Sequence, residues 1–365
     1  MTRTVLSRRF LAGIAGVALA ALTVAGCSTS TGNGNPAPSG SAGTDLKSLA
    51  GSLKFTGATF PGAYYNKALD EFSNVAPDLD VTYQGVGSGQ GKKDFGAGLN
   101  DFAASDSLVK AGDGPAADSW YYIPTVAAPI TVSYNLSGVT GLKLSGPTLA
   151  KIMATTIKNW SDPAIAADNT GVTLPNKPIV VAHRSEGSGT TNNFTKFLVA
   201  AGGADWTLGT GDSITWPATT QGAQGNGGVA QLIKQSDGAI GYVDFSDAKA
   251  SDLTFAAVKN ADGKYIVPNL VSAAAAADGT TVNADLTYDP INASGAGAYP
   301  ITSPTWIMVM ADQTDAAKGN AIKGFLNYIY ADGQQLATSV DYAPLPKTLL
   351  GKAKAQVKKI TVAAS

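Results

Sequence analysis

The stretch from 179 to 197 has the pattern of a strand, a short loop and a helix. Residues 179–182 are an apolar, β-branched run of strand length, and Phe194 and Phe197 recur at helical spacing. The loop between them is rich in glycine and hydroxyl residues and opens a helix near Thr190. Backbone N–H groups and the positive end of the helix dipole come together at such a start. This unit therefore predicts a site for a small anion.

The same loop carries side chains that donate hydrogen bonds. Arg184 stands just before the turn, and Ser188 and Thr190 lie within it. Each has an ordinary alternative role, because serine and threonine commonly cap helices and a single arginine is usually a solvated surface residue. The same order of strand, glycine-hydroxyl loop and helix occurs twice more upstream, with loops at 56–62 and 85–91. That recurrence favours the anion site.

The loop at 85–91 does not fit a nucleotide-binding motif. Counting back from Gly91, Val86 stands where the first glycine of a Walker A motif belongs, and Lys93 stands where its hydroxyl residue belongs. In the dinucleotide-binding pattern, Gln90 replaces the third glycine. We therefore expect this loop to bind a small anion and not a nucleotide.

Strands and helices alternate along the chain, which predicts α/β domains with largely parallel sheets. In such sheets ligands bind at the carboxyl ends of strands, where all three loops lie. A chain of 365 residues is long enough for two domains. The expected strands are 53–55, 81–84, 122–126, 130–134, 179–182, 238–243 and 306–310, and the expected helices are 63–72, 92–99, 147–156, 190–200 and 322–329. The alanine run at 273–277 is expected to be an irregular helix or a loop.

The composition excludes several classes of site. A formal net charge of −1 gives no indication of a nucleic-acid or polyanion partner. With one histidine and one cysteine in the chain, only clusters of Asp and Glu could bind a metal, and none has a useful spacing. We therefore expect neither a metal nor a cofactor. The histidine, His183, is expected to be a strand-end residue.

The N-terminus has the pattern of an export signal. Three arginines precede an apolar run at 10–24, which is too short to favour a membrane-spanning helix. The segment closes with Val-Ala-Gly-Cys27, which resembles the lipobox of bacterial lipoproteins, and this resemblance implies a lipid on Cys27. We expect a signal peptide at 1–26 and a flexible linker at 27–48. The export route, general secretory or twin-arginine, stays open.

Ordered sequence blocks over nearly all of the remaining chain resemble the phosphate-binding proteins of bacterial high-affinity phosphate ABC transporters, the PstS family. Any one block is weakly specific, but eight blocks in the same order are specific. The blocks are Gly57-Ala-Thr-Phe-Pro61, Tyr83-Gln-Gly-Val-Gly-Ser88, Asp101-Phe-Ala-Ala-Ser-Asp106, Arg184 with Gly187-Ser-Gly-Thr190, Trp216-Pro217, Gly238-Ala-Ile-Gly-Tyr-Val243, Pro300-Ile-Thr-Ser303 and Asp341-Tyr-Ala-Pro-Leu-Pro346.

The resemblance implies a type II periplasmic-binding-protein-like fold. In this fold two α/β domains, with mostly parallel sheets flanked by helices, are joined by a hinge that the chain crosses twice. By similarity, lobe I comprises 49–128 and 304–361, and lobe II comprises 129–303. The resemblance also implies phosphate contacts at Ala58, Thr59, Phe60, Ser88, Asp106, Arg184, Ser188, Gly189 and Thr190.

Within this set Asp106 has a distinct chemical role. Phosphate near neutral pH is mostly a dianion that still carries a proton, whereas sulfate carries none. The hydroxyl, backbone and guanidinium groups donate to anion oxygens, while an ionised Asp106 can only accept. It would accept the ligand's own proton, whereas sulfate would place two unprotonated oxygens against each other. We therefore expect Asp106 to select phosphate over sulfate.

One position departs from the family pattern. Glu186 stands where well-known members have an aspartate that pairs with the binding arginine. Because glutamate is one methylene longer, both a pair with Arg184 and a solvated loop carboxylate stay open for it.

The expected function is that of a lipid-anchored receptor at the extracytoplasmic face of the bacterial cell membrane. It would bind inorganic phosphate and deliver it to the transmembrane permease subunits of an ABC transporter, as a monomer without enzymatic activity. Two alternatives stay open: a phosphate-ester hydrolase, and a phosphate-responsive surface protein that uses the same anion site. A hydrolase usually needs a metal cluster or an activated nucleophile with a base, and we find no residues at the spacing for either.

Overall fold

The computed structural model of the protein describes residues 45–110 and 114–364. The predicted signal peptide, Cys27 and the linker up to residue 44 lie outside these residues. The last residues of the predicted linker belong to the folded part, because η1 (Leu46–Ser48) is a short 3-10 helix and Leu46 lies against Gly324. Within the described ranges, no helix combines the length and the apolar character needed to cross a membrane.

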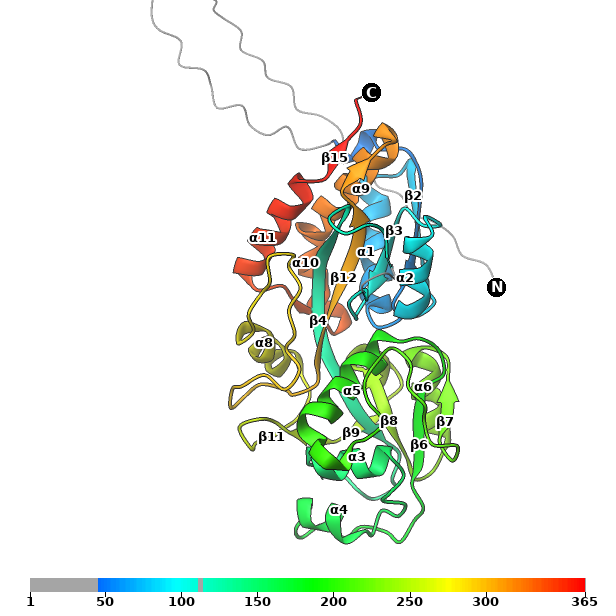
Figure 1. The fold of residues 1–365 in the computed structure, drawn as a ribbon, viewed down its shortest axis with the longest axis vertical. Helices are drawn as coiled ribbons and strands as arrows, with labels where there is room; N and C mark the ends of the chain where they lie inside the picture. Colours follow the sequence, from blue (N-terminus) through cyan, green and yellow to red (C-terminus); the bar gives the residue numbers. More distant parts are fainter. Residues whose placement is uncertain (1–44, 111–113, 365) are drawn as a thin grey trace, which may run out of the picture. The chain divides into compact units, whose positions relative to one another are not determined.

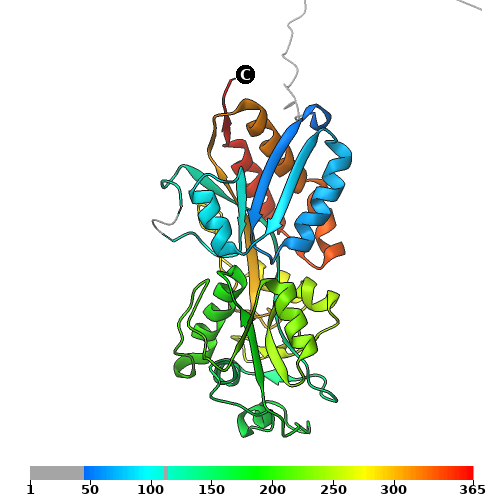
Figure 2. The ribbon, with the colours of Figure 1, turned by 90° about the vertical axis from the view of Figure 1, so that its right-hand side faces the viewer.

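The centre of the fold is a sheet with the strand order β2-β1-β3-β12-β4-β8-β6-β7. Near one end, β1 (Gly51–Gly57) pairs in parallel with β2 (Leu79–Gly85) and β3 (Phe102–Ser105). Near the other end, β6 (Val180–Arg184) pairs in parallel with β7 (Gln221–Ala223) and β8 (Ala239–Asp244). Helices flank both parts (Figure 1 and Figure 2). The expected α/β class with two sheet regions is confirmed.

The elements around β1–β3 are called lobe I here, and those around β6–β8 are called lobe II. Lobe I also contains α1 (Gly62–Val75), α2 (Ser88–Gly96), β13 (Asp312–Gln313), α9 (Ala316–Ile329), α10 (Asp332–Leu336), η3 (Ala337–Val340), β14 (Ala343–Pro344), α11 (Lys347–Lys358) and β15 (Thr361–Val362). Lobe II also contains β5 (Lys143–Leu144), α3 (Gly146–Met153), α4 (Pro163–Asp168), α5 (Gly189–Gly202), η2 (Gly203–Asp205), α6 (Gly225–Gln235), α7 (Phe245–Ala250), β9 (Thr254–Phe255), β10 (Ala257–Lys259) and β11 (Tyr265–Ile266).

Two long strands run from one lobe into the other. β4 (Trp120–Tyr134) pairs with β12 (Thr302–Met310) along its first part and with β8 along its last part. The chain therefore passes between the lobes twice, once in each strand (Figure 1). Because β4 and β12 run in opposite directions, their pairs are antiparallel, whereas the outer pairs of each lobe are parallel. The predicted lobe boundaries, 128/129 and 303/304, fall within these two strands.

The expectation of two separate strands at 122–126 and 130–134 was wrong, because β4 runs through both. The Ala-Ala-Pro sequence at 127–129 belongs to the strand and does not separate two strands, although proline removes one ladder hydrogen bond. In the structure every residue of 122–134 is buried. Burial on both faces favours a continuous extended chain, because any turn here would leave unpaired backbone groups away from water.

Two helices also differ from expectation. α2 begins at Ser88 and not near Lys92, because Gly87 adopts a φ of +94° and lets the chain enter the helix at once. The alanine run lies in a regular helix, α8 (Leu270–Asp278), which packs against β4, β12 and β14. Its start is fixed by a capping box, in which Asn269 and Ser272 each bond the other's backbone N–H.

Gly57 lies at the end of β1, where the chain leaves the sheet. Its φ is +144°, and a Cβ at this position would lie 2.0 Å from the carbonyl oxygen of Ala104 on β3. The Gly57 carbonyl accepts hydrogen bonds from the amides of Val86 and Gly87, both at 2.8 Å. The ends of β1, β2 and β3 are thereby held together, so the loops that follow them start from one edge of the sheet.

We predict that Gly57→Ala lowers the free energy of unfolding by about 3 kcal/mol or more, since the added methyl group overlaps the β3 backbone. Gly51→Ala is the matched control. It lies on the same strand with a φ of +110°, but a Cβ there meets no heavy atom within 4 Å. It should cost only about 1 kcal/mol. Urea unfolding followed by circular dichroism measures both variants, and equal losses would contradict the packing argument.

Candidate functional site

The N-termini of four helices converge between the lobes: α1 and α2 from lobe I, and α5 and α6 from lobe II. Ser88, the first residue of α2, lies against Gly189, the first residue of α5, where a Cβ would be 2.6 Å from the serine Oγ. Asn226, the second residue of α6, donates to Thr59 in the loop before α1 at 3.1 Å. Four helix starts thus direct free N–H groups and positive dipole ends into one region.

Asp106 follows β3 and faces this region. Ser88 Oγ donates to Asp106 Oδ2 at 3.3 Å and accepts from the Asp106 amide at 3.2 Å. From lobe II, Asn193 Nδ2 donates to the Asp106 carbonyl at 2.7 Å. A Cβ on Gly189 would lie 2.9 Å from Asp106 Oδ2, so the carboxyl group lies directly against the start of α5. The structure therefore brings Ser88, Asp106 and Gly189 together.

Burial raises the pKa of Asp106 to about 7, although the neighbouring hydroxyl groups of Thr305 and Ser88 and the charge of Arg184 act in the opposite direction. Only 1% of the residue is exposed. Its Oδ1 is buried and has no hydrogen-bond partner among the described residues. A carboxyl group in this state readily accepts or shares one proton.

Arg184 ends β6 and is also buried. Its Nη1 donates to Thr190 Oγ1 at 3.4 Å, and its Nε donates to Glu186 Oε1 at 3.0 Å, with Nη2 on the same oxygen. The Gly225 amide donates to that oxygen as well, at 2.9 Å. Burial alone would raise the pKa of Glu186, but the hydrogen bonds and charge of Arg184 lower it overall. Of the two roles left open for Glu186, the structure shows the pair with Arg184.

Three of the predicted contact residues form hydrogen bonds with other groups of the protein. Ala58 donates its amide to Ala104 and accepts from the hydroxyl of Tyr83 at its carbonyl, so it would contribute shape and no hydrogen bond to a ligand. The Phe60 carbonyl accepts from the hydroxyl of Tyr342. Ser188 is the N-cap of α5, and its Oγ accepts from Thr191 N at 3.1 Å. Ser188 therefore also has the ordinary role of a helix cap. Its hydroxyl proton is not used in the cap, so it is available to donate to a ligand.

Asn226 was missed by sequence reasoning. It is fully buried, and its Nδ2 lies 3.1 Å from Thr59 Oγ1 and 3.2 Å from Thr190 Oγ1. It thus joins a hydroxyl of lobe I to a hydroxyl of lobe II. A signal was present, because Gly-Asn-Gly-Gly at 225–228 follows the short strand β7 and opens α6. The strand at 221–223 has only three residues and no apolar run, so the pattern was not recognised.

The lobes also touch beside these residues. The amide of Gly89 donates to the carbonyl of Gly187 at 3.0 Å, and a Cβ on Gly89 would lie 3.0 Å from the Gly187 Cα. Lys92 and Asp212 form a largely buried ion pair across the lobes at 2.6 Å, and Lys92 donates to Ser107 Oγ at 2.8 Å. These contacts describe a closed arrangement of the two lobes.

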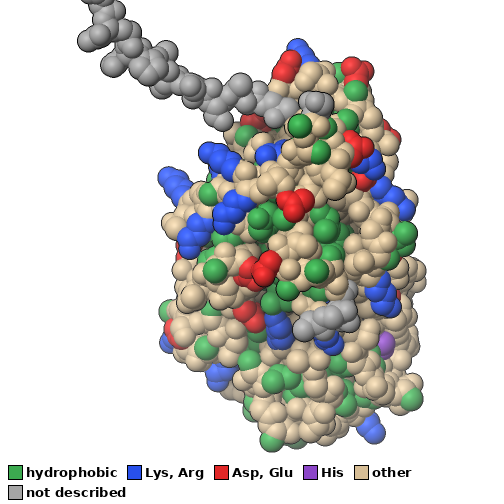
Figure 3. Space-filling view, turned by 45° about the horizontal axis from the view of Figure 1, so that its top comes forward, with side chains coloured by type: hydrophobic (Ala, Val, Ile, Leu, Met, Phe, Trp, Pro, Cys, Tyr) green, Lys and Arg blue, Asp and Glu red, His purple; other side chains and the backbone are tan. Residues whose placement is uncertain are grey.

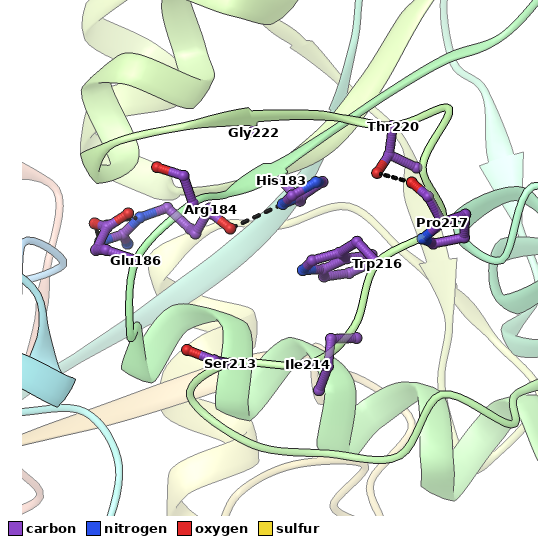
Figure 4. A pocket seen from close by; sticks show the side chains of 10 residues that line it. His183, Arg184, Glu186, Ser213, Ile214, Trp216, Pro217, Thr220 and Gly222 are labelled. Atoms are coloured by element: carbon purple, nitrogen blue, oxygen red, sulfur yellow. Dashed lines mark hydrogen bonds and ion pairs between the residues drawn. The ribbon is translucent and has the colours of Figure 1, made fainter.

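A cavity of about 380 Å³ lies beside β6 and is lined by residues of β6, by Gly222 of β7 and by the segment that contains Trp216. His183 stacks on Trp216 within it, with ring centroids 4.7 Å apart. Figure 4 shows Arg184 and Glu186 at one end of this cavity, with their charged groups directed toward each other and away from the Trp216 ring. The lining of this cavity therefore includes the Arg184–Glu186 pair but not Ser88, Asp106 or Gly189 between the helix starts. His183 lies inside β6, near the strand end where it was expected.

The arrangement suits one small anion with acceptor oxygens. Hydroxyls, amides of the first turn of α5 and the Arg184 guanidinium supply donors from both lobes, and Asp106 supplies one acceptor. Among the described residues, no group of three or more His, Cys, Asp or Glu side chains is placed to hold a metal ion.

Comparisons with known proteins identify the family of the chain. Residues 37–333 match the family model described as a PBP superfamily domain. The phosphate-binding protein PstS of Pasteurella multocida is 35% identical over 319 residues, which cover 86% of this chain and 92% of that protein. PstS of Xylella fastidiosa is 34% identical over 351 residues, which cover 92% of this chain and 94% of that protein.

Among solved structures, the high-affinity periplasmic phosphate-binding protein PfluDING, determined with bound phosphate, superimposes with a TM-score of 0.69. The match has 24% sequence identity and covers 84% of this chain and 93% of that chain. It supports the expected fold, with two α/β lobes and a hinge that the chain crosses twice. The chain belongs to the PstS family of phosphate-binding proteins within the PBP superfamily.

Proposed function

We propose that this protein is an extracytoplasmic receptor that binds inorganic phosphate between its lobes and delivers it to the permease of an ABC transporter. The observation that carries the proposal is Asp106, a buried carboxyl group with a free oxygen among donors from four helix starts. Family membership supports the same ligand and a transport role. The phosphate contacts would be Thr59, Phe60, Ser88, Asp106, Arg184, Ser188, Gly189 and Thr190, with Ala58 shaping the loop.

The chemistry of binding follows from which groups donate. Phosphate oxygens would accept from hydroxyls, from amides of α5 and from Arg184, while the one protonated oxygen would donate to Asp106. The raised pKa of Asp106 means that the ligand-free carboxyl group holds a proton readily near pH 7. One proton then lies between carboxyl group and phosphate in the complex, whichever partner brings it. Sulfate carries no proton at this pH, so it could bind only to the protonated carboxyl group, and the preference for phosphate should grow as pH rises above the Asp106 pKa of about 7.

Delivery requires the lobes to open. We propose that β4 and β12 are the hinge strands and that the boundaries at 128/129 and 303/304 lie within them. The interlobe contacts of Gly89 with Gly187 and of Lys92 with Asp212 would form on closure. On the face shown in Figure 3, basic side chains gather at the upper left and acidic side chains lie mostly elsewhere, while the whole chain has a net charge of −1. The proposal therefore rests on local donors and not on a charged surface.

A lipid anchor on Cys27 would hold the receptor at the outer face of the cell membrane, with the residues before η1 as a tether. The support is the Val-Ala-Gly-Cys sequence after the apolar run at 10–24. A monomer is proposed, because one chain supplies both sides of the anion site. A hydrolase is less favoured, since a buried Asp106 that shares a proton with the ligand is poorly placed to activate water.

Calorimetric titration of the protein without its first 44 residues tests the proposal. Phosphate should bind with one site per chain, and sulfate at the same concentration should give no heat of binding. A chromogenic phosphate ester, incubated in parallel, should not be turned over. Turnover of the ester, or phosphate binding no tighter than sulfate binding, would contradict the receptor.

Asp106→Asn should reduce the preference for phosphate over sulfate by about tenfold or more, because the amide donates where the carboxylate rejects an unprotonated oxygen. Competition titrations with both anions measure this preference. The control is Asp101→Asn, since Asp101 pairs with Lys318 in lobe I and does not belong to the proposed site. A preference unchanged in Asp106→Asn would count against the selectivity mechanism.

The ligand-free protein should lose stability as pH rises toward 7 because of Asp106. Its pKa in the folded state, about 7, lies above the ordinary value of 3.8, so the folded protein binds this proton more tightly than the unfolded chain. The stabilisation is complete below about pH 4 and is lost as pH rises through 7. Asp106→Asn should therefore match the wild type at pH 4 and exceed it by about 4 kcal/mol at pH 8. Phosphate-free urea unfolding at both pH values measures the difference, and a constant offset would exclude this explanation.

Cys27→Ala, expressed with the leader in a bacterial host, should move the protein from the membrane fraction to the soluble fraction. The reason is that a lipid chain supplies the proposed membrane attachment. Phosphate binding by the released protein serves as the control for folding. Equal membrane partitioning of both forms would refute the anchor and leave the phosphate site untouched.

A further inference from the structure

We infer that Asn226 is a positioning residue of the anion site, which holds the hydroxyl groups of Thr59 and Thr190 as hydrogen-bond donors toward the ligand. This inference rests on the proposed phosphate site and adds a residue to it. Asn226 lies at the start of α6, outside the three loops that the sequence indicated.

The amide of Asn226 contacts both lobes at once. Nδ2 carries two protons, and it donates to Thr59 Oγ1 of lobe I at 3.1 Å and to Thr190 Oγ1 of lobe II at 3.2 Å. The residue is 0% exposed, so water does not replace these bonds. The carbonyl oxygen Oδ1 is buried without a partner among the described residues. The side chain is therefore held through its NH2 group.

The hydrogen bonds that Thr190 accepts determine the direction of its own O–H group. Its oxygen accepts from Asn226 Nδ2 and also from Arg184 Nη1 at 3.4 Å. A hydroxyl oxygen has two lone pairs, so both are occupied and only the O–H proton remains. That group can then act only as a donor. At Thr59, the bond from Asn226 likewise occupies a lone pair and turns the O–H proton away from the amide.

A hydroxyl that is free to rotate can present either a lone pair or a proton to an anion. Only the proton attracts, and the lone pair repels an anionic oxygen. Asn226 removes the unfavourable orientation before the ligand arrives. Such preorganisation strengthens binding because less ordering remains to be done when the complex forms.

The start of α6 also helps to hold Arg184, the third hydrogen-bond donor beside Thr59 and Thr190. Gly225, next to Asn226, has a φ of +71° and donates its amide to Glu186 Oε1, the oxygen that holds Arg184. The start of α6 thus acts on the hydroxyls through a side chain and on the guanidinium through the backbone. This placement distinguishes Asn226 from a buried asparagine that only fills a hydrogen-bond network.

The first test compares Asn226→Ala with Asn226→Asp by phosphate titration and stopped-flow dissociation. The alanine variant should bind phosphate about tenfold more weakly, mainly through faster dissociation. The aspartate variant has the same shape but accepts where Asn226 donates. It would draw the threonine protons away from the ligand, so binding should weaken by about a hundredfold. Wild-type affinity in Asn226→Asp would overturn the inference.

A double-mutant cycle separates positioning from a general structural role. Once Thr59→Val has removed the hydroxyl, Asn226→Ala has one fewer group to orient, so the two losses in affinity should be less than additive. Additive losses would contradict the positioning role. The cycle with Thr190→Val should show the same sign.

Asn260→Ala is the matched control for stability. Asn260 is also a buried asparagine of lobe II with two Nδ2 bonds, to the carbonyls of Gly295 and Ala298. It should lose stability but keep wild-type phosphate affinity. If the wild-type protein fails to bind phosphate, the proposed function is wrong. If the wild type binds and Asn226→Ala binds equally well, only the present inference is wrong.

Discussion

A negative charge that leaves water must be met by donors already held in place, and this protein holds them at the first turns of four helices. The first-turn amides have no partners within their own helices, so each helix start brings free N–H groups with it. Two of the helices come from each lobe. Both lobes contribute to the proposed site, so we propose that an anion is enclosed when the lobes come into contact. A transport receptor requires such a coupling, because ligand binding then favours the closed form and the closed form favours ligand binding.

Close backbone contact makes that enclosure tight. Gly89 and Gly187 meet between the lobes, and Gly57 meets Ala104 at the edge of the sheet from which the loops depart. Side chains at these positions would hold the loops apart by the width of a methyl group. These glycines thus allow chain segments to come close together, and the residues next to them supply the hydrogen-bond donors. The glycine-rich composition is explained in part by this requirement.

In the proposed site Asp106 is the acceptor among the donors, and we propose that it gives the site its preference for phosphate. Asp106 has a raised pKa because it is buried, even though Arg184 and two hydroxyls lower it. A site built only from donors would take any tetrahedral anion of suitable size. With one carboxyl group, the proposed site would favour an anion that shares a proton with Asp106. Glu186 has the opposite environment, because Arg184 outweighs its burial and keeps it ionised as the partner of the guanidinium.

Local patterns along the chain were enough for the α/β class, for three of the four helices at the site, although α2 begins at Ser88 and not near Lys92, and for the residue types around an anion. These features depend on neighbours within about ten positions, where strand, turn and helix preferences act. The sequence alone could not show that β4 continues through Ala-Ala-Pro, since burial by β12 and β8 decides this. It left the role of Glu186 open, because the Gly225 amide that also holds this carboxylate is 39 positions away, and it missed Asn226, whose partners Thr59 and Thr190 are 167 and 36 positions away. Which polar groups meet in space was decided by the packing of the two lobes, since only that packing determines where water is excluded.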